Sequence, residues 1–141
     1  LYAAFGRGGD MPAMRERLDL AAPEPARPFT DAGAAWVIGD ILADAPAPDG
    51  AIAGRLAYKT GTSYGHRDAW AIGFDGRRTI AVWVGRPDGS SVPGITGRTA
   101  AAPILFDAFA RLGGIRPLPG RPVHLAALSN AQLPPALRAR E

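Results

Sequence analysis

The sequence predicts an α+β fold, an antiparallel sheet with helices packed on both faces. The expected elements follow one another as helix, three strands and helix. Asp75 and Gly76 join two apolar runs, which is typical of a β-hairpin. These runs, residues 69 to 74 and 79 to 84, do not alternate between polar and apolar residues, which predicts strands covered on both sides.

Composition limits the classes of protein to consider. The chain has 141 residues, 47% of them hydrophobic, without a run long enough to cross a bilayer. It has no cysteine, which excludes disulfides and thiolate metal sites. The net charge of +3 comes from scattered arginines rather than a basic block. Because the sequence starts at Leu1 without an initiator Met, a basic n-region or an apolar h-region, we expect an incomplete fragment with any targeting segment outside it.

The first third of the chain predicts two helices. Residues 2 to 9 read as a helix end broken by a glycine-rich turn, and residues 15 to 21 as a short exposed strand. A clearer helix is expected to start with Thr30 as its cap and Asp31 in its first turn, and to end near Ala43. Its spacing predicts a buried face made of Ala34, Val37, Ile38, Ile41 and Leu42.

The rest of the chain predicts a sheet, a helix and a tail. A strand over residues 55 to 58 leads to Lys59, and the glycine- and proline-rich residues 86 to 98 predict a loop. Residues 99 to 112 predict a helix that ends at two glycines. We assign residues 1 to 113 to one domain and residues 114 to 141 to a proline-rich extended tail or linker. The last helix is expected to bury Ile104, Leu105, Ala108, Phe109 and Leu112.

The strongest functional signal is the segment Lys59-Thr60-Gly61-Thr62-Ser63. Lys59 is the only lysine among sixteen basic residues. Lysine places a compact charge on a thin stem, which suits a tight cleft better than a guanidinium does. Gly61 lets a ligand approach the backbone, and the two threonines offer hydroxyl and amide donors to an oxyanion. The segment therefore predicts half of an acyl-transfer site.

A longer pattern extends this segment. The Lys-Thr-Gly box is followed by Asp68, Trp70 and Gly73 at a fixed spacing, and then by residues 81 to 85 and 97 to 103. Together these residues resemble the C-terminal part of a penicillin-binding transpeptidase domain, most closely the bifunctional class A penicillin-binding protein 1C type.

The resemblance implies a function in the cell wall. In this family a serine attacks the D-alanyl-D-alanine end of a peptidoglycan stem peptide, forms an acyl-enzyme and passes the acyl group to an amine of a neighbouring strand. β-Lactams acylate the same serine. The resemblance also implies a place on the periplasmic face of the bacterial inner membrane, an upstream glycosyltransferase domain and chemistry without metal or cofactor.

Two of the three family motifs are missing here. The family needs Ser-x-x-Lys, Ser-x-Asn and Lys-Thr-Gly. The only lysine, Lys59, has Leu56 three positions before it, so the first motif is absent. An asparagine two positions on, as the second motif requires, follows none of the serines Ser63, Ser90, Ser91 and Ser129. We therefore expect this chain alone to be inactive.

The resemblance assigns roles to the third motif. Lys59 would attract the substrate carboxylate and support the proton relay around the missing serine, as a desolvated ammonium. The hydroxyls of Thr60 and Thr62 would bind that carboxylate, and the Thr62 N–H would be one of two oxyanion donors. Gly61 and Ser63 complete the predicted substrate-binding stretch. A strand edge with free backbone groups would pair with the extended stem peptide.

Simpler roles are expected for the neighbouring polar and aromatic residues. Trp70 and Trp83 lie in apolar runs and are expected in the core. Asp68 is expected to pair with a backbone or arginine group. His66 is expected to be a solvated loop residue, and His124 has no partners for a metal site.

Three other functions stay open or are disfavoured. Nucleic-acid binding on a sheet needs aromatic residues on an open face with basic residues between them, so no nucleic-acid partner is expected for strands apolar on both faces. A non-catalytic interaction domain of the same fold is possible, because the deciding motifs lie upstream. A serine D,D-carboxypeptidase or β-lactamase also uses Lys-Thr-Gly.

Overall fold

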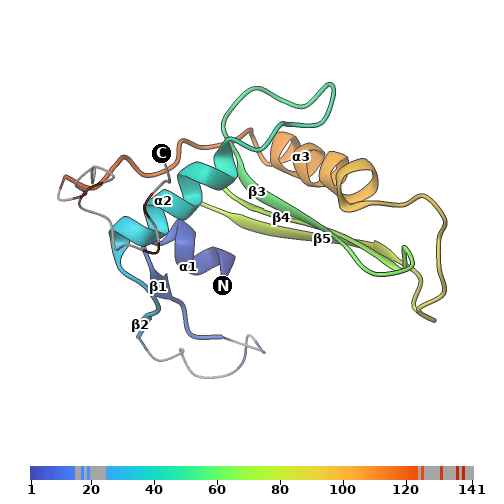
Figure 1. The fold of residues 1–141 in the computed structure, drawn as a ribbon, viewed down its shortest axis with the longest axis horizontal. Helices are drawn as coiled ribbons and strands as arrows, with labels where there is room; N and C mark the ends of the chain where they lie inside the picture. The colour runs from blue at the N-terminus through green and yellow to red at the C-terminus, as the bar shows by residue number, and fades with distance from the viewer. Residues whose placement is uncertain are drawn as a thin grey trace.

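The computed structural model describes residues 1–14, 17, 19, 25–123, 125, 131, 136 and 138, and it confirms the α+β fold. The predicted strand over residues 15 to 21 falls largely outside these residues. The main sheet has three strands, and Figure 1 shows helices along it and at one end. The elements are α1 (Tyr2–Gly6), β1 (Asp10–Met11), β2 (Arg27–Pro28), α2 (Ala32–Ala43), β3 (Ala57–Thr62), β4 (Asp68–Phe74), β5 (Thr79–Gly85), the π-helix η1 (Gly97–Ala101) and α3 (Ala102–Arg111).

The three-stranded sheet has the predicted order and direction. β3 pairs with β4 and β4 with β5, both antiparallel, so the hairpin prediction and the place of the Lys59 strand are confirmed. The turn is displaced by one residue from the predicted Asp75-Gly76 centre, because Asp75 N–H donates to Arg78 O (3.0 Å). The carboxylate of Asp75 also accepts from the N–H groups of Arg77 and Arg78 (2.8 and 2.7 Å), which fixes a turn centred on Gly76 and Arg77.

One face of the sheet packs against η1 and α3 and forms the main core. Leu105, Phe106 and Phe109 are buried there against Tyr58 and the small residues of β4. The predicted buried face of this helix was partly wrong: Leu105 and Phe109 are buried, but Ile104 and Leu112 are 51% and 56% exposed. The helix turns its Phe106 side to the sheet, where the ring meets Tyr58 edge-on.

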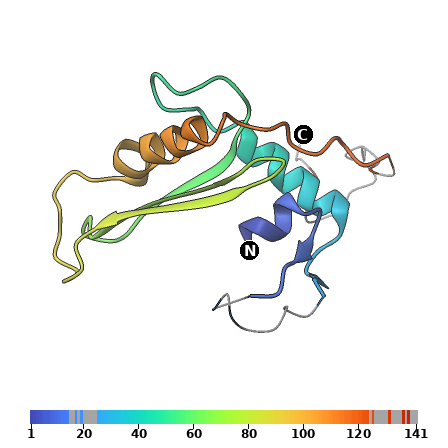
Figure 2. The ribbon, with the colours of Figure 1, turned by 180° about the vertical axis from the view of Figure 1, so that it is seen from behind.

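The opposite face of the sheet is covered at one end only. α1 and α2 pack around Phe74, which is 1% exposed, but Trp70 and Trp83 are 43% and 42% exposed. Coverage of the whole sheet on both sides and core positions for the tryptophans were therefore wrong predictions for this chain. Figures 1 and 2 show α3 along one side of the sheet, with α1 and α2 gathered at one end. Strand alternation leaves Lys59 as the sole basic residue of β3, β4 and β5 on the open face.

Helix α2 begins and packs differently from its prediction. Its N-cap is Asp31, whose carboxylate accepts from Ala34 N–H (2.9 Å), so the assignment of the cap to Thr30 was wrong. Small residues form its buried side, and Gly39 lies beside the ring of Phe74. The predicted face was partly wrong: Val37 and Ile41 are 38% and 66% exposed, whereas Leu42 is partly buried against the Phe74 cluster. Contact with a large aromatic ring favours small residues on the helix side that touches it.

The chain after α3 is extended, as predicted, and it lies against the domain. Residues 115 to 122, here called the C-terminal segment, run from α3 toward α2 (Figure 1). Arg116 N–H donates to the buried carboxylate of Asp75 (3.0 Å), and Trp36 Nε1–H donates to Pro119 O (3.2 Å). The domain boundary at residue 113 stays a prediction.

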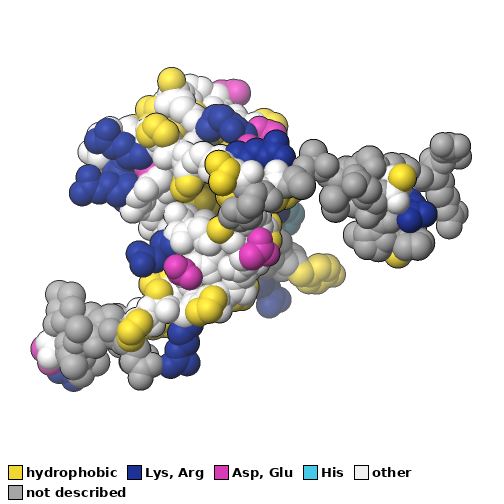
Figure 3. Space-filling model, turned by 90° about the vertical axis from the view of Figure 1, so that its left-hand side faces the viewer, with side chains coloured by type: hydrophobic (Ala, Val, Ile, Leu, Met, Phe, Trp, Pro, Cys, Tyr) yellow, Lys and Arg dark blue, Asp and Glu magenta, His cyan; other side chains and the backbone are white. Residues whose placement is uncertain are grey.

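Two further features concern the surface. None of the helices among the described residues has the length and apolar character needed to cross a membrane. On the face seen in Figure 3, the Lys and Arg side chains stand at several places among acidic and hydrophobic ones.

Candidate functional site

Strand β3 carries the predicted site, and Tyr58 fixes it in place. The ring of Tyr58 is 3% exposed, and its hydroxyl donates to Pro46 O (2.5 Å). Arg98 also donates to Pro46 O (3.0 Å), so β3 and the start of η1 both donate to one acceptor in the loop before β3. The residue directly before Lys59 is therefore held by both the core and the loop.

The outer edge of β3 presents backbone groups of the predicted site. Ser63 N–H donates to Asp68 O (2.9 Å), which marks Ser63 and Asp68 as a hydrogen-bonded pair. Because such pairs alternate in an antiparallel ladder, the backbone groups of Gly61 point toward β4. The backbone groups of Thr60 and Thr62 point to the opposite edge of β3, where none of the described strands pairs with it. The predicted oxyanion donor, Thr62 N–H, is thus directed to a free edge.

Lys59 reaches this same edge. Its side chain leaves β3 on the sheet face opposite α3, and Nζ then donates to Thr60 O at 2.5 Å. The ammonium therefore lies close to the backbone groups of the free edge. Lys59 is exposed, so this chain does not itself provide the desolvation expected for the residue.

Gly61 meets no requirement of the fold on its open side. Its φ is not positive, and a Cβ placed on it would meet Trp70 Cβ at 3.7 Å, an ordinary contact. Neither backbone conformation nor packing on that side requires glycine here. The space left by the missing side chain lies beside the exposed Trp70 and is available to a group from outside.

Thr62 is held from the other face of the sheet by η1. Gly97 N–H donates to Thr62 Oγ1 at 3.0 Å. Thr62 as a residue is nevertheless exposed, and its backbone N–H points to the free edge of β3. The sequence pattern singled out the segment that starts at Gly97 but did not predict this contact.

Ser63 closes the turn between β3 and β4. Its Oγ accepts from Asp68 N–H (2.8 Å), in addition to the backbone pair between the two residues. The carboxylate of Asp68 accepts from Trp83 Nε1–H (2.8 Å), so its partner is an indole and not the predicted backbone or arginine group. Asp68 and Trp83 occur on neighbouring strands, and the sequence alone did not place them together.

His66 ties the β3–β4 turn to the loop of residues 86 to 96. It is exposed, as predicted, with a positive φ of 54°. Its Nδ1 lies 2.7 Å from Ile95 O, and its carbonyl accepts from Val92 N–H (3.0 Å). Because a carbonyl oxygen only accepts, Nδ1 carries the proton. His66 therefore anchors the loop that leads into η1.

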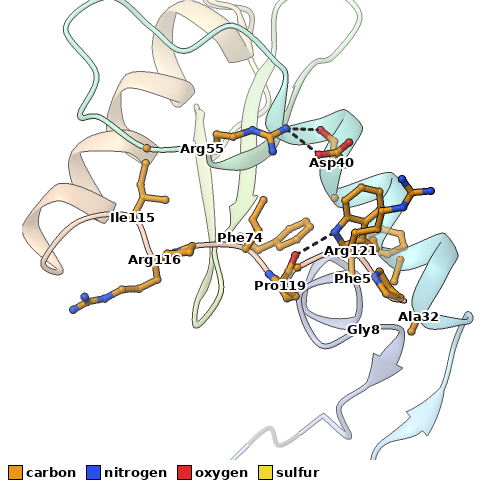
Figure 4. A pocket seen from close by; sticks show the side chains of 18 residues that line it. Phe5, Gly8, Ala32, Asp40, Arg55, Phe74, Ile115, Arg116, Pro119 and Arg121 are labelled. Carbon is orange, nitrogen blue, oxygen red and sulfur yellow. Dashed lines mark hydrogen bonds and ion pairs between the residues drawn. The ribbon is translucent and has the colours of Figure 1, made fainter. Parts of the chain in front are cut away.

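A large cavity lies away from β3. It has a volume of about 570 Å³ between α2 and the C-terminal segment and is lined by Trp36, Phe74 and Leu118 among others. Figure 4 shows Arg55 paired with Asp40 at its border. Pro119, also labelled there, accepts through its carbonyl from Trp36 Nε1–H. Neither Lys59 nor Thr62 lines it, so this cavity is separate from the predicted site.

Comparison with known proteins shows which proteins this chain is similar to. It is 49% identical over 108 residues to penicillin-binding protein 1C of Escherichia coli, an alignment that covers 74% of this chain. The chain is related to the penicillin-binding proteins of the 1C type. The resemblance read from the Lys-Thr-Gly box and its surroundings is thereby confirmed.

Shorter matches link the chain to other penicillin-binding proteins. It is 44% identical over 46 residues to penicillin-binding protein 1B of Vibrio cholerae, which covers 33% of this chain and 6% of that protein. The match to penicillin-binding protein 1B of Haemophilus influenzae is 42% over 53 residues, or 38% of this chain and 7% of that protein. No protein-family model matches the chain. The match to the Escherichia coli protein spans only 14% of that protein's length.

Proposed function

We propose that this chain is the Lys-Thr-Gly part of a serine D,D-transpeptidase that crosslinks peptidoglycan stem peptides and is acylated by β-lactams. The single observation that carries the proposal is the arrangement at the free edge of β3. There, the Lys59 ammonium, the Thr62 N–H and the Thr62 hydroxyl lie within one short stretch of strand. Relationship to penicillin-binding protein 1C supports it.

The proposed chemistry divides between this chain and a longer protein. A serine outside the chain attacks the D-alanyl-D-alanine carbonyl; the new ester C–O bond forms, the peptide C–N bond breaks and the leaving D-alanine takes the proton. An amine of a second stem peptide then attacks the ester: the new amide C–N bond forms, the ester C–O bond breaks and the serine oxygen takes the proton of the amine. Thr62 N–H would donate to the oxyanion, a contribution of about 3 kcal/mol to barrier lowering. Lys59 and the Thr60 and Thr62 hydroxyls would bind the substrate carboxylate.

The open sheet face supports a transpeptidase-like fold completed by other parts of a longer protein. Trp70 and Trp83 are more exposed than tryptophans of a finished core, and α2 and α3 also expose large apolar residues. Because the alignment spans 14% of the Escherichia coli relative, further chain is available to cover them. As the resemblance to penicillin-binding proteins implies, we propose that this protein lies on the periplasmic face of the inner membrane and is held there by an anchor outside these residues. An upstream glycosyltransferase domain would make it bifunctional.

Covalent labelling of the full-length protein tests the proposal. A fluorescent penicillin should form one stoichiometric adduct on a serine of an upstream Ser-x-x-Lys motif, and a D-alanyl-D-alanine stem peptide with an amine acceptor should give crosslinked product. Full-length protein that takes up no penicillin would favour the non-catalytic interaction domain. Release of D-alanine, or hydrolysis of the β-lactam, without crosslinking would favour a carboxypeptidase or a β-lactamase.

A further inference from the structure

Gly97 contacts the backbone of β3 and β4 more closely than an amino acid with a side chain could at this position. A Cβ placed on Gly97 would lie 2.4 Å from Trp70 O and 2.5 Å from Gly61 O. Both atoms belong to paired strands and cannot move aside separately. The φ of Gly97 is not positive, so close contact explains the glycine, and backbone conformation does not.

The contact brings one hydrogen-bond donor to the site. Gly97 N–H donates to Thr62 Oγ1 at 3.0 Å. A hydroxyl has one hydrogen and two acceptor lone pairs, so an oxygen that accepts from Gly97 must direct its own hydrogen elsewhere. The Gly97 contact therefore directs the hydrogen of the Thr62 hydroxyl, together with its second lone pair, away from η1. A carboxylate, which only accepts, matches this orientation.

The start of η1 is fixed on both sides of Gly97. Thr96 caps the helix by accepting from Thr99 N–H (3.1 Å). Before it, Ile95 O is bonded to the ring of His66. Gly97 N–H is thus held in place by its own neighbours.

We propose that Gly97 is a positioning residue that commits the Thr62 hydroxyl to donating to the carboxylate of the acyl donor. This inference rests on the proposed function and deepens it. Gly97 acts through Thr62, without touching the substrate. It makes the site selective for acyl donors that carry a carboxylate over neutral analogues of the same shape.

The test compares two probes on the full-length protein: benzylpenicillin, which has a carboxylate, and its methyl ester, which does not. The measured quantity is the ratio of their second-order acylation rate constants. Gly97→Ala should lower this ratio about tenfold, because it weakens a charge-assisted hydrogen bond that only the first probe makes. Damage to the fold alone would slow both probes equally and leave the ratio unchanged.

Matched variants separate the effect of the Gly97 N–H on Thr62 from a general effect of a Gly→Ala change on the fold. Gly120→Ala, where an added Cβ meets nothing within 4 Å, should leave the ratio as it is. Thr62→Ser, which keeps the hydroxyl, should leave the ratio of acylation rate constants unchanged. Thr62→Val, which removes the hydroxyl, should lower this ratio. Gly97→Ala should then lower the ratio no further in a Thr62→Val background, since both changes remove the same interaction.

The outcomes distinguish failure of the positioning role from failure of the proposed function. If the wild type is acylated and Gly97→Ala leaves the ratio unchanged, the positioning role is overturned and the proposed function stands. If neither probe acylates the wild type, both are overturned. If Gly97→Ala does not fold, hydrogen exchange of the Gly97 backbone amide is measured in the Thr62 variants. The Gly97 N–H should exchange faster in Thr62→Val than in Thr62→Ser. Equal exchange in these two variants would overturn the positioning role.

Discussion

Trp70 and Trp83 occupy directly opposed positions on β4 and β5, on the sheet face that α3 leaves open. Trp83 Nε1–H donates to Asp68 Oδ1 at 2.8 Å, which holds that indole across the strands near the β3–β4 turn. Trp70 lies opposite Gly61. The aromatic pair therefore borders the proposed site on its exposed side.

We expect these tryptophans to be covered in the full-length protein. In a Trp36→Phe background, acrylamide should quench the two remaining indoles strongly in the 141-residue chain and weakly in the corresponding segment of full-length protein. The physical reason is that each indole is more than two-fifths exposed in this chain, at 43% and 42%. Equal quenching in both proteins, with their other tryptophans substituted, would show that the face stays open.

The 141-residue chain alone should take up no covalent penicillin and should not transfer D-alanyl peptides, because it lacks Ser-x-x-Lys and Ser-x-Asn. The proposed oxyanion donor, Thr62 N–H, would not replace a nucleophile. Mass spectrometry after incubation with a fluorescent penicillin measures this. A stoichiometric adduct on any of its own serines would require a different nucleophile assignment.

Lys59→Ala should abolish β-lactam acylation of the full-length protein, and Lys59→Arg should keep a minor part of it. Arginine keeps the charge but presents a wider, planar group at the edge of β3. Because Lys59 is exposed and its Nζ bonds only to Thr60 O among the interactions described, either change should alter the free energy of unfolding by less than about 0.5 kcal/mol.

Paired measurements of acylation rate and melting temperature check the Lys59 prediction. His66→Ala serves as the control in the same region: it loses the bond to Ile95 O but should keep most of the acylation. Normal acylation by Lys59→Ala, or a melting temperature lowered as far as by a core deletion, would make Lys59 a structural residue.

Gly61→Ala should preserve the fold and lower acylation of the full-length protein at least about tenfold. The added methyl group meets only Trp70 Cβ at 3.7 Å, so the chain itself tolerates it. A tolerated Gly→Ala change commonly raises stability by up to about 1 kcal/mol. The loss of acylation comes from the methyl group filling space that a ligand needs. Denaturation curves that show strong destabilisation would contradict this reading of Gly61.

Asp75 should make the fold sensitive to acid. Burial by itself would raise the pKa of Asp75, but hydrogen bonds from the N–H groups of Arg116, Arg77 and Arg78, with the Arg78 guanidinium, outweigh it and lower the pKa. A carboxyl whose pKa is lowered in the folded state stabilises the fold above its ordinary pKa, and this contribution is lost as pH falls through the lowered value. We therefore expect stability to drop below about pH 4.

Denaturant unfolding as a function of pH checks the role of Asp75. Asp75→Ala should lower the free energy of unfolding by about 3 kcal/mol at neutral pH, because it leaves several buried N–H groups without an acceptor. It should also flatten the acid dependence. Asp107→Ala is the control, since that carboxylate is exposed and pairs only with Arg111 on the same helix among the described contacts. An unchanged acid dependence in Asp75→Ala would assign the acid sensitivity to another group.

The sequence by itself determined the order of α2, β3, β4, β5 and α3, and it singled out the segment that carries the candidate site. Local signals were sufficient for this: Gly113 and Gly114 end α3 with positive φ, and the apolar runs on either side of the Asp75 turn pair as predicted. The Lys-Thr-Gly box and its spacing to Asp68 and Trp70 also carried the relationship to penicillin-binding protein 1C.

Only the tertiary structure decided which side of each element is buried and what holds the site. Helical spacing favoured Val37 and Ile41, but the ring of Phe74 selects the Gly39 side of α2. The contact of Gly97 with Thr62 joins residues 35 positions apart in sequence. Burial and long-range hydrogen bonds depend on how elements pack against one another, and hydrophobic periodicity carries no information about a partner contributed from elsewhere in the chain or absent from it.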